Sequence, residues 1–239
     1  MLCPPPHPAP ELTTNRLLAA LPADEYAALH PHLEVLYLVP GAPIYEPGEA
    51  MRHVYFPLTG ITSVVAMMAE GGMVEVGTIG REGLVGLPIF HGTDRSPLKT
   101  IAQVPGHHAR LPVAAFRAAA SQGTALHDVL HHFAQAYYVL TAQCGACNRL
   151  HPVEGRCARW LLLTHDRAGA DTFQLTHEFL GYMLGARRPS VTVAAGMLQR
   201  AGLITYHRGV VTILDRPGLE AATCECYGTI RDEFARLLG

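Results

Sequence analysis

Four side chains suited to hydrogen-bonded recognition and one apolar side chain stand close together between residues 187 and 193. Arg187 and Arg188 each carry a planar guanidinium, which can pair with two acceptors on the edge of one guanine. Ser190 and Thr192 carry hydroxyls that can reach phosphate oxygens, and Val193 offers a methyl surface that fits the methyl group of thymine. This combination predicts a surface that contacts base edges and phosphates together. An ordinary solvated helix is the alternative.

Cysteines form a second group that could carry chemistry. Cys144 and Cys147 make a Cys-x-x-Cys on an expected continuous helix, and no second Cys or His pair follows at zinc-finger spacing. We expect small buried helix residues at both positions, with an interchain disulfide or a shared metal as the alternative. Cys224 and Cys226 alternate along the chain and are not expected to form a closed site. The sequence therefore assigns no metal-binding residue.

Histidines raise the alternative of a metal centre on a β-domain. The candidates are His107-His108 and the group His127, His131 and His132, in which His127 and His131 share one helix face. Because no carboxylate or third ligand stands at an obvious spacing, surface or pH-titrating histidines are the expectation. A phosphate-binding loop, a nucleophile elbow and a dinucleotide-binding glycine pattern are absent from the sequence, which therefore predicts no enzyme.

The arginine-rich segment requires two helices to position it. Apolar residues recur at helical spacing over 175–184, with Thr176 placed to cap the start. Gly185 then interrupts the pattern, where a left-handed turn residue costs least. A second helix opens at Arg187-Arg188-Pro189, since proline in a first turn lacks an N–H that would have no helical partner. Gly202 closes this second helix.

A hairpin follows the two helices. The β-prone runs 203–206 and 210–214 flank His207-Arg208-Gly209, so that helix, glycine turn, helix and hairpin outline a winged helix-turn-helix. Residues 174–213 carry four arginines against one glutamate, although the whole chain has 18 basic and 20 acidic side chains. A local basic patch is therefore expected here. The predicted DNA-contacting residues are Arg187, Arg188, Pro189, Ser190, Thr192, Val193, His207 and Arg208.

A longer pattern runs through this segment and its surroundings. It comprises Thr176-His177-Glu178, Leu180-Gly181, Leu184-Gly185, Arg188, Ser190-Val191, Leu198 and Gly202-Leu203-Ile204, with residues 153–162 upstream and Tyr45–Glu49 and Val54–Gly60 in the first half. This pattern resembles the Crp/Fnr family of bacterial transcription regulators. The resemblance implies an α+β chain with an N-terminal antiparallel β-roll of the cyclic-nucleotide-binding kind, a long dimerisation helix and a C-terminal winged helix-turn-helix.

The resemblance also implies partners and one residue role. It implies a homodimer bound to a near-palindromic operator in double-stranded DNA, with Arg188 reading a base and RNA polymerase as a further partner. Two base-reading positions of the family fall on Pro189 and Val193, where cyclic-AMP-responsive members have Glu and Arg. The target sequence is therefore expected to differ from theirs. A ligand- or metal-sensing β-roll that acts through protein contacts is the alternative function.

The length of 239 residues allows two modest domains. We expect a disordered proline-rich tail at 1–14, a sensor domain at 15–123, a dimerisation helix at 124–149 and a winged-helix domain with a helical extension at 150–239. Short β-prone runs between 35 and 111 alternate with turn signals, as in a β-roll or sandwich. No signal peptide or membrane span is evident in the sequence, which predicts a cytoplasmic protein.

The predicted dimerisation helix carries an apolar stripe. Seven residues recur at separations of 4, 3, 4, 3, 4 and 3, an a/d pattern that predicts a seam between two protomers. A long helix packed on its own domain is the alternative. The predicted seam residues are Leu126, Leu130, Phe133, Tyr137, Leu140, Cys144 and Cys147.

The expected effector site departs from the family pattern. Arg95-Ser96 matches the pair that takes the cyclic phosphate, but Gly86-Leu87 stands where the family has Gly-Glu, and leucine cannot accept a ribose hydroxyl bond. Glu82 could replace that acid only in a rebuilt loop. Arg95, Ser96 and Glu82 are thus possible effector-binding residues, but no cofactor is predicted, with a cyclic nucleotide as the alternative. Cys3 alone cannot supply the N-terminal cysteine cluster of the family's iron–sulfur members.

Overall fold

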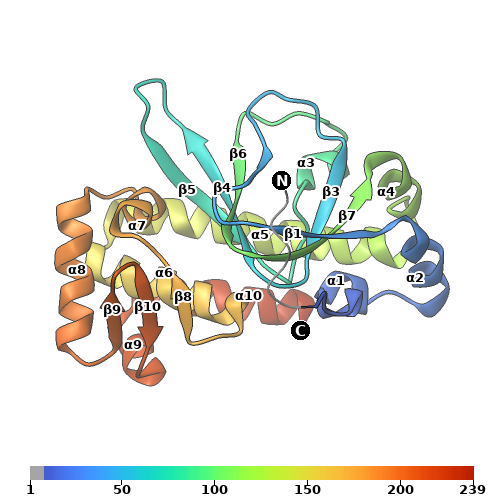
Figure 1. The fold of residues 1–239 in the computed structure, drawn as a ribbon. Helices are drawn as coiled ribbons and strands as arrows, with labels where there is room; N and C mark the ends of the chain where they lie inside the picture. Colours follow the sequence, from blue (N-terminus) through green and yellow to red (C-terminus); the bar gives the residue numbers. More distant parts are fainter. Residues whose placement is uncertain (1–7) are drawn as a thin grey trace. The chain divides into compact units, whose positions relative to one another are not determined.

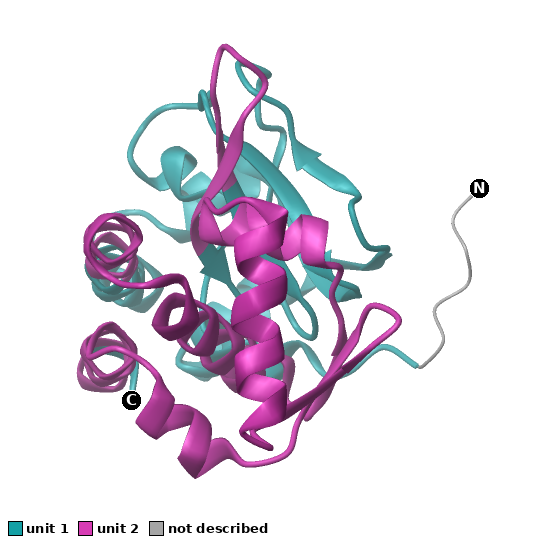
Figure 2. Ribbon diagram, turned by 90° about the vertical axis from the view of Figure 1, so that its left-hand side faces the viewer, with its two compact units in different colours: residues 1–64, 78–136, 237–239 teal, residues 65–77, 137–236 magenta. Residues whose placement is uncertain are grey.

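The structure, a computed structural model, describes residues 8–239 and divides into two compact units (Figures 1 and 2). The first unit contains the chain up to Val64, Thr78–Ala136 and Leu237–Gly239, and the second contains Val65–Gly77 and Tyr137–Arg236. Strands and helices both occur, as the predicted α+β class requires. The order of antiparallel sheets, long helix and helix-turn-helix is also confirmed.

The β-roll consists of two antiparallel sheets, ordered β1-β7-β3 and β2-β6-β4-β5. Val54 and Phe56 on β3 lie opposite Leu111 and Ala109 on β7, and all four are 0% exposed. Every second residue therefore faces the core, as the strand period demands. The strands are β1 Glu34–Leu38, β2 Pro43–Tyr45, β3 His53–Pro57, β4 Ile61–Met67, β5 Met73–Ile79, β6 Lys99–Val104 and β7 Gly106–Pro112.

Short helices surround these strands. They are η1 Leu12–Thr14, α1 Arg16–Ala19, α2 Ala23–Leu29, η2 His30–His32, α3 Leu87–Phe90 and α4 Val113–Ala119. The 3-10 helix η1 occupies part of the segment where the sequence predicts a disordered tail, and the prediction for residues 1–7 lies outside the described residues. Neither α3 nor the three-residue strand β2 is predicted, because both are too short to show a period.

A buried histidine makes the stability of the roll depend on pH. His108 is 0% exposed, its Nε2 lies 3.3 Å from the hydroxyl oxygen of Thr62, and burial lowers its pKa to about 4. Between pH 6.5 and about 4, the unfolded chain therefore binds a proton that the folded chain does not bind. We expect the free energy of unfolding to fall by up to roughly 3 kcal/mol as the pH drops through this window.

Urea unfolding at a series of pH values measures this effect. His108→Gln keeps a polar group without a titration, so the variant should lose less stability than the wild type as the pH falls. The same substitution at exposed His132 serves as the matched control and should leave the pH dependence of the free energy of unfolding unchanged. An identical pH dependence in His108→Gln and the wild type would contradict the assignment.

The long helix α5, Ala125–Leu150, has 26 residues and matches the predicted helix to within one residue at each end. Its first turn is capped from a distance, because the carboxylate of Glu25 accepts hydrogen bonds from the backbone N–H groups of Ala125, at 2.8 Å, and Leu126, at 3.2 Å. Such a carboxylate pairs two of the N–H groups that a helix start leaves without a helical partner.

The apolar stripe of α5 faces the chain's own interior, so the predicted dimer seam is wrong. Phe133 is 0% exposed, and a Cβ added at Gly83 would lie 2.4 Å from its ring. Tyr137 and Leu140 pack on Gly77 in the same way. The a/d spacing records that one helix face is apolar, not what covers it. The stripe comprises Leu126, Leu130, Phe133, Tyr137, Leu140, Cys144 and Cys147, of which all but the half-buried Tyr137 are buried.

The second unit carries the remaining helices and a three-stranded sheet, ordered β8-β10-β9 and antiparallel throughout. Its elements are α6 Val153–Ala168, β8 Thr172–Gln174, α7 His177–Leu184, α8 Arg188–Arg200, β9 Ile204–His207, β10 Val210–Ile213, α9 Arg216–Ala222 and α10 Cys226–Leu238. In the part of the chain that the structure describes, no helix is both long and apolar enough to cross a membrane.

Candidate nucleic-acid interface

The turn between α7 and α8 has the geometry that the sequence predicts. The hydroxyl of Thr176 accepts a hydrogen bond from the N–H of Phe179 at 3.1 Å and caps α7. Gly185 ends α7 in the left-handed region, with φ 55° and ψ 40°. A Cβ at Gly181 would lie 3.0 Å from the carbonyl oxygen of Ala186, so the chain passes closely over this position. The cap, the left-handed glycine and the close backbone approach together fix where α8 begins.

Helix α8 (Figure 1) buries a small apolar face and exposes the remaining side chains. Val191, Ala194, Ala195 and Leu198 are at most 5% exposed. The six predicted DNA-contacting residues of this helix and its N-cap are all exposed, and Val193 is 56% exposed. They are Arg187, Arg188, Pro189, Ser190, Thr192 and Val193. The structure thus gathers them on one accessible surface at the positive end of the helix dipole.

The hairpin places two further predicted residues at its tip. Val210 pairs with His207, which leaves a two-residue turn of Arg208 and Gly209 with φ 49° and 78°. Two left-handed residues in succession form the turn type that fits the twist of a hairpin. His207 and Arg208 are both exposed there. Strand β8 pairs with β10 on the other side, an element that the sequence analysis misses.

A histidine and a tyrosine that the sequence analysis does not assign hold α8 in place. The ring of His177 stacks on Tyr206, with centroids 4.2 Å apart, and its Nδ1 lies 3.1 Å from the hydroxyl oxygen of Thr192. That hydroxyl donates to the carbonyl of Arg188 at 3.0 Å. Burial, and then the charge of Arg188, lower the pKa of His177. Stacking between α7 and β9 depends on tertiary structure, and no local spacing signals it.

The three possible effector-binding residues each have a local partner. Arg95 donates from Nη1 to the carbonyl of Gly48 at 2.7 Å and is 63% exposed at the side chain. The hydroxyl of Ser96 accepts from the N–H of Leu98, and the carboxylate of Glu82, in a residue 7% exposed, accepts from the N–H of Gly80. Glu82 is thus directed into its own turn.

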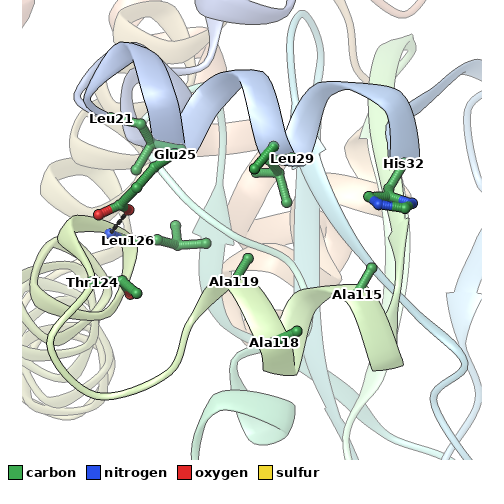
Figure 3. Close-up of a pocket in the computed structure, with 10 residues that line it drawn as sticks. Leu21, Glu25, Leu29, His32, Ala115, Ala118, Ala119, Thr124 and Leu126 are labelled. Carbon is green, nitrogen blue, oxygen red and sulfur yellow. Dashed lines mark hydrogen bonds between the residues drawn. The ribbon is translucent and has the colours of Figure 1, made fainter.

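A cavity of about 330 Å³ lies elsewhere in the first unit, between α2 and α4 (Figure 3). Leu21, Leu29 and the alanines of α4 line it, and Figure 3 shows the carboxylate of Glu25 hydrogen-bonded to the N–H of Leu126 at one end. Neither Arg95, Ser96 nor Glu82 borders it. The space is therefore distinct from the position at which the family resemblance implies an effector.

Cys144 and Cys147 are buried residues of α5, as the sequence predicts. Cys144 accepts a hydrogen bond from Nη1 of Arg159 at 2.8 Å, whereas Cys147 lies with its Sγ 3.5 Å from that of Cys224. Ligand atoms of Cys147, Cys224, Cys226 and one histidine all lie within 4.8 Å of one another. Cys224 and Cys226, which are not expected from the sequence to form a closed site, thus lie close to Cys147 and to a histidine. The ring contacts of His127 are with His131 and Phe90.

Comparisons with known proteins agree with this architecture. Residues 35–122 match the cyclic nucleotide-binding domain, and residues 155–222 match the Crp-like helix-turn-helix domain. No curated protein matches the chain.

Solved structures share the fold at low sequence identity. A transcriptional regulator of the Crp/Fnr family from Eubacterium rectale is 16% identical, with 88% of this chain and 98% of that chain covered and a TM-score of 0.68. FixK2 from Bradyrhizobium japonicum is 16% identical, with 80% and 98% covered and a TM-score of 0.69. TTHA1359 from Thermus thermophilus is 21% identical, with 79% and 97% covered and a TM-score of 0.64.

Both domain matches thus fall on the elements described above, one on the β-roll and the other on the helices and hairpin that expose Arg187, Arg188 and Arg208. The chain belongs to the Crp/Fnr family and is a DNA-binding transcription regulator.

Proposed function

We propose that the protein acts as a homodimer that inserts two α8 helices into successive major grooves of a near-palindromic operator. The observation that carries this proposal is the outward face of α8, where Arg187 and Arg188 are exposed beside the capped turn. Arg188 reads a base, and Pro189 and Val193 face the neighbouring bases. Ser190, Thr192, His207 and Arg208 contact phosphates, which fix the register of the protein on the duplex.

We propose the exposed face of α5 as the contact between protomers, because the apolar stripe of this helix is already covered. Tyr138, Ala142, Gly145 and Arg149 are exposed at separations of 4, 3 and 4 residues, and Tyr138 is 67% exposed. Ala142 and Gly145 are small enough to let two helix backbones approach closely. A tyrosine at one end supplies a large area that a partner can cover.

DNA binding is proposed to occur without cyclic AMP. The acid that would hold a ribose is replaced by Leu87, and the nearby Glu82 is buried against Gly80. We place the protein in the cytoplasm, where the operator and RNA polymerase are its partners.

Selection of bound fragments from a random double-stranded DNA library tests this function. At near-physiological salt and without nucleotide, we expect a near-palindromic consensus with half-sites about one helical turn, 10–10.5 base pairs, apart. The consensus should differ from that of cyclic-AMP-responsive members at the bases facing Pro189 and Val193. Enrichment that appears only with added cyclic AMP would contradict the effector-free proposal. If no fragment is enriched with or without cyclic nucleotides, the proposal of sequence-specific DNA binding is contradicted.

A further inference from the structure

Four residues from two distant segments of the second unit meet with metal-binding atoms inward. Cys147 lies in the last turn of α5 and His151 directly after it, while Cys224 and Cys226 flank the start of α10. The two Sγ atoms of Cys147 and Cys224 are 3.5 Å apart, and Sγ of Cys226 lies 3.4 Å from Nδ1 of His151. All four ligand atoms lie within 4.8 Å of one another.

The two separations of 3.5 and 3.4 Å match the spacing of ligand atoms around one tetrahedral ion. Zinc–sulfur bonds of about 2.3 Å and a zinc–nitrogen bond of about 2.0 Å give tetrahedron edges of about 3.5 to 3.8 Å. Cys147 and Cys226 are 0% exposed, whereas His151 and Cys224 are half-buried. The site is thus closed on one side and reachable from the other, with three sulfurs and one imidazole nitrogen, a donor set that structural zinc sites use.

Neighbouring polar groups orient the proposed ligands. The second ring nitrogen of His151, Nε2, lies 3.2 Å from a carboxylate oxygen of Glu225. Nδ1 is thereby left to bind an ion, the arrangement in which a carboxylate fixes the tautomer of a metal-bound histidine. Nε2 of Gln143 donates to Sγ of Cys226 at 3.1 Å, as a donor to a thiolate would. Neither contact follows from apolar packing.

Buried positive charge near the four residues also favours a negatively charged metal site. Arg156 and Arg159 are 7% and 2% exposed, and they donate to the carbonyls of Asn148 and Leu184 and to Sγ of Cys144. Among the described residues, no carboxylate pairs with either guanidinium, and a buried unpaired charge is costly. Three thiolates around a dication carry a net charge of −1, which would supply the missing counter-charge.

We propose that Cys147, His151, Cys224 and Cys226 form a Cys3His zinc site. Binding forms three Zn–S bonds and one Zn–N bond, with neutral His151 as ligand, and releases the three thiol protons to solvent. The ion joins the end of α5 to the loop between α9 and α10, and so anchors the helical extension that follows the wing. Arg156, which bridges the carbonyls of Asn148 and Leu184, connects this anchor to the end of α7.

Zinc content of the full-length protein tests the site. Protein purified under reducing conditions, equilibrated with Zn²⁺ and freed of unbound metal, should retain one zinc ion per chain. Replacing zinc with Co²⁺ should give the intense d–d and sulfur-to-cobalt absorption of a tetrahedral thiolate site. Cys224→Ala should lose the bound ion, while Cys157→Ala, which removes a buried thiol of α6 outside the cluster, should retain it.

Glu225→Gln provides a variant that leaves the packing intact, since the Glu225 side chain is 75% exposed. Loss of the carboxylate partner of His151 should weaken zinc binding about 10- to 100-fold in competition with a chelator. Three results would overturn the proposal: no zinc retained by the reduced wild type, full retention by Cys224→Ala, or a Cys147–Cys224 disulfide found by mass in place of the metal.

Discussion

Replacing Arg188 with alanine should lower the affinity of the dimer for its operator by about 2–6 kcal/mol, because each of two half-sites loses roughly 1–3 kcal/mol. Arg188 is the first residue of α8 and is exposed at the start of the helix. A bidentate pair with guanine carries sequence information that no backbone contact replaces. Titration of labelled duplexes, one selected and one scrambled, measures the effect at fixed salt concentration.

The comparison between duplexes decides what Arg188 does. If Arg188 reads a base, its removal should cost much more binding free energy on the selected duplex than on the scrambled one. The preference for one base should also relax at a single position in each half-site. Equal losses on both would identify a phosphate contact instead. Arg117→Ala is the matched control, because it removes the same charge from an exposed position on α4. Its affinity should stay close to that of the wild type.

The helix-turn-helix could be predicted from sequence because its determinants are local. Thr176 caps within three residues, Gly185 reverses the chain, and Arg208 and Gly209 form the hairpin turn. Each depends on the φ preference or hydrogen bonding of a residue and its near neighbours. The exposed face of α8 then follows from the helical period, so that the predicted contacts of this helix fall on one surface.

The features that sequence reasoning missed depend on long-range contacts. Cys147 and Cys224 are 77 residues apart along the chain, and no spacing rule relates them. Strand β8 is three residues long and exists through its pairing with β10. The spacing along α5 predicts an apolar stripe correctly but does not identify what covers it, since a helix seam and a domain core bury the same side chains.

Because the apolar stripe of α5 is covered within the protomer, a substitution on the exposed face of this helix should have the second large effect. Ala142→Glu should convert the dimer to a monomer, because two glutamates would face each other across the exposed face of α5 without a counter-charge. A monomer holds one half-site, so about half of the specific binding free energy should be lost, roughly 2–5 kcal/mol. Sedimentation equilibrium gives the assembly state, and the duplex titration gives the affinity.

Two matched variants separate this effect from a general loss of structure. Ala27→Glu adds the same charge to an exposed alanine of α2 and should leave the dimer intact. Leu130→Glu introduces the charge into the buried stripe and should lower the melting temperature of the protein itself, since Leu130 is 0% exposed. An Ala142→Glu protein that remains a dimer with unchanged helix content would show that the protomers meet elsewhere than on the face of Tyr138, Ala142 and Gly145.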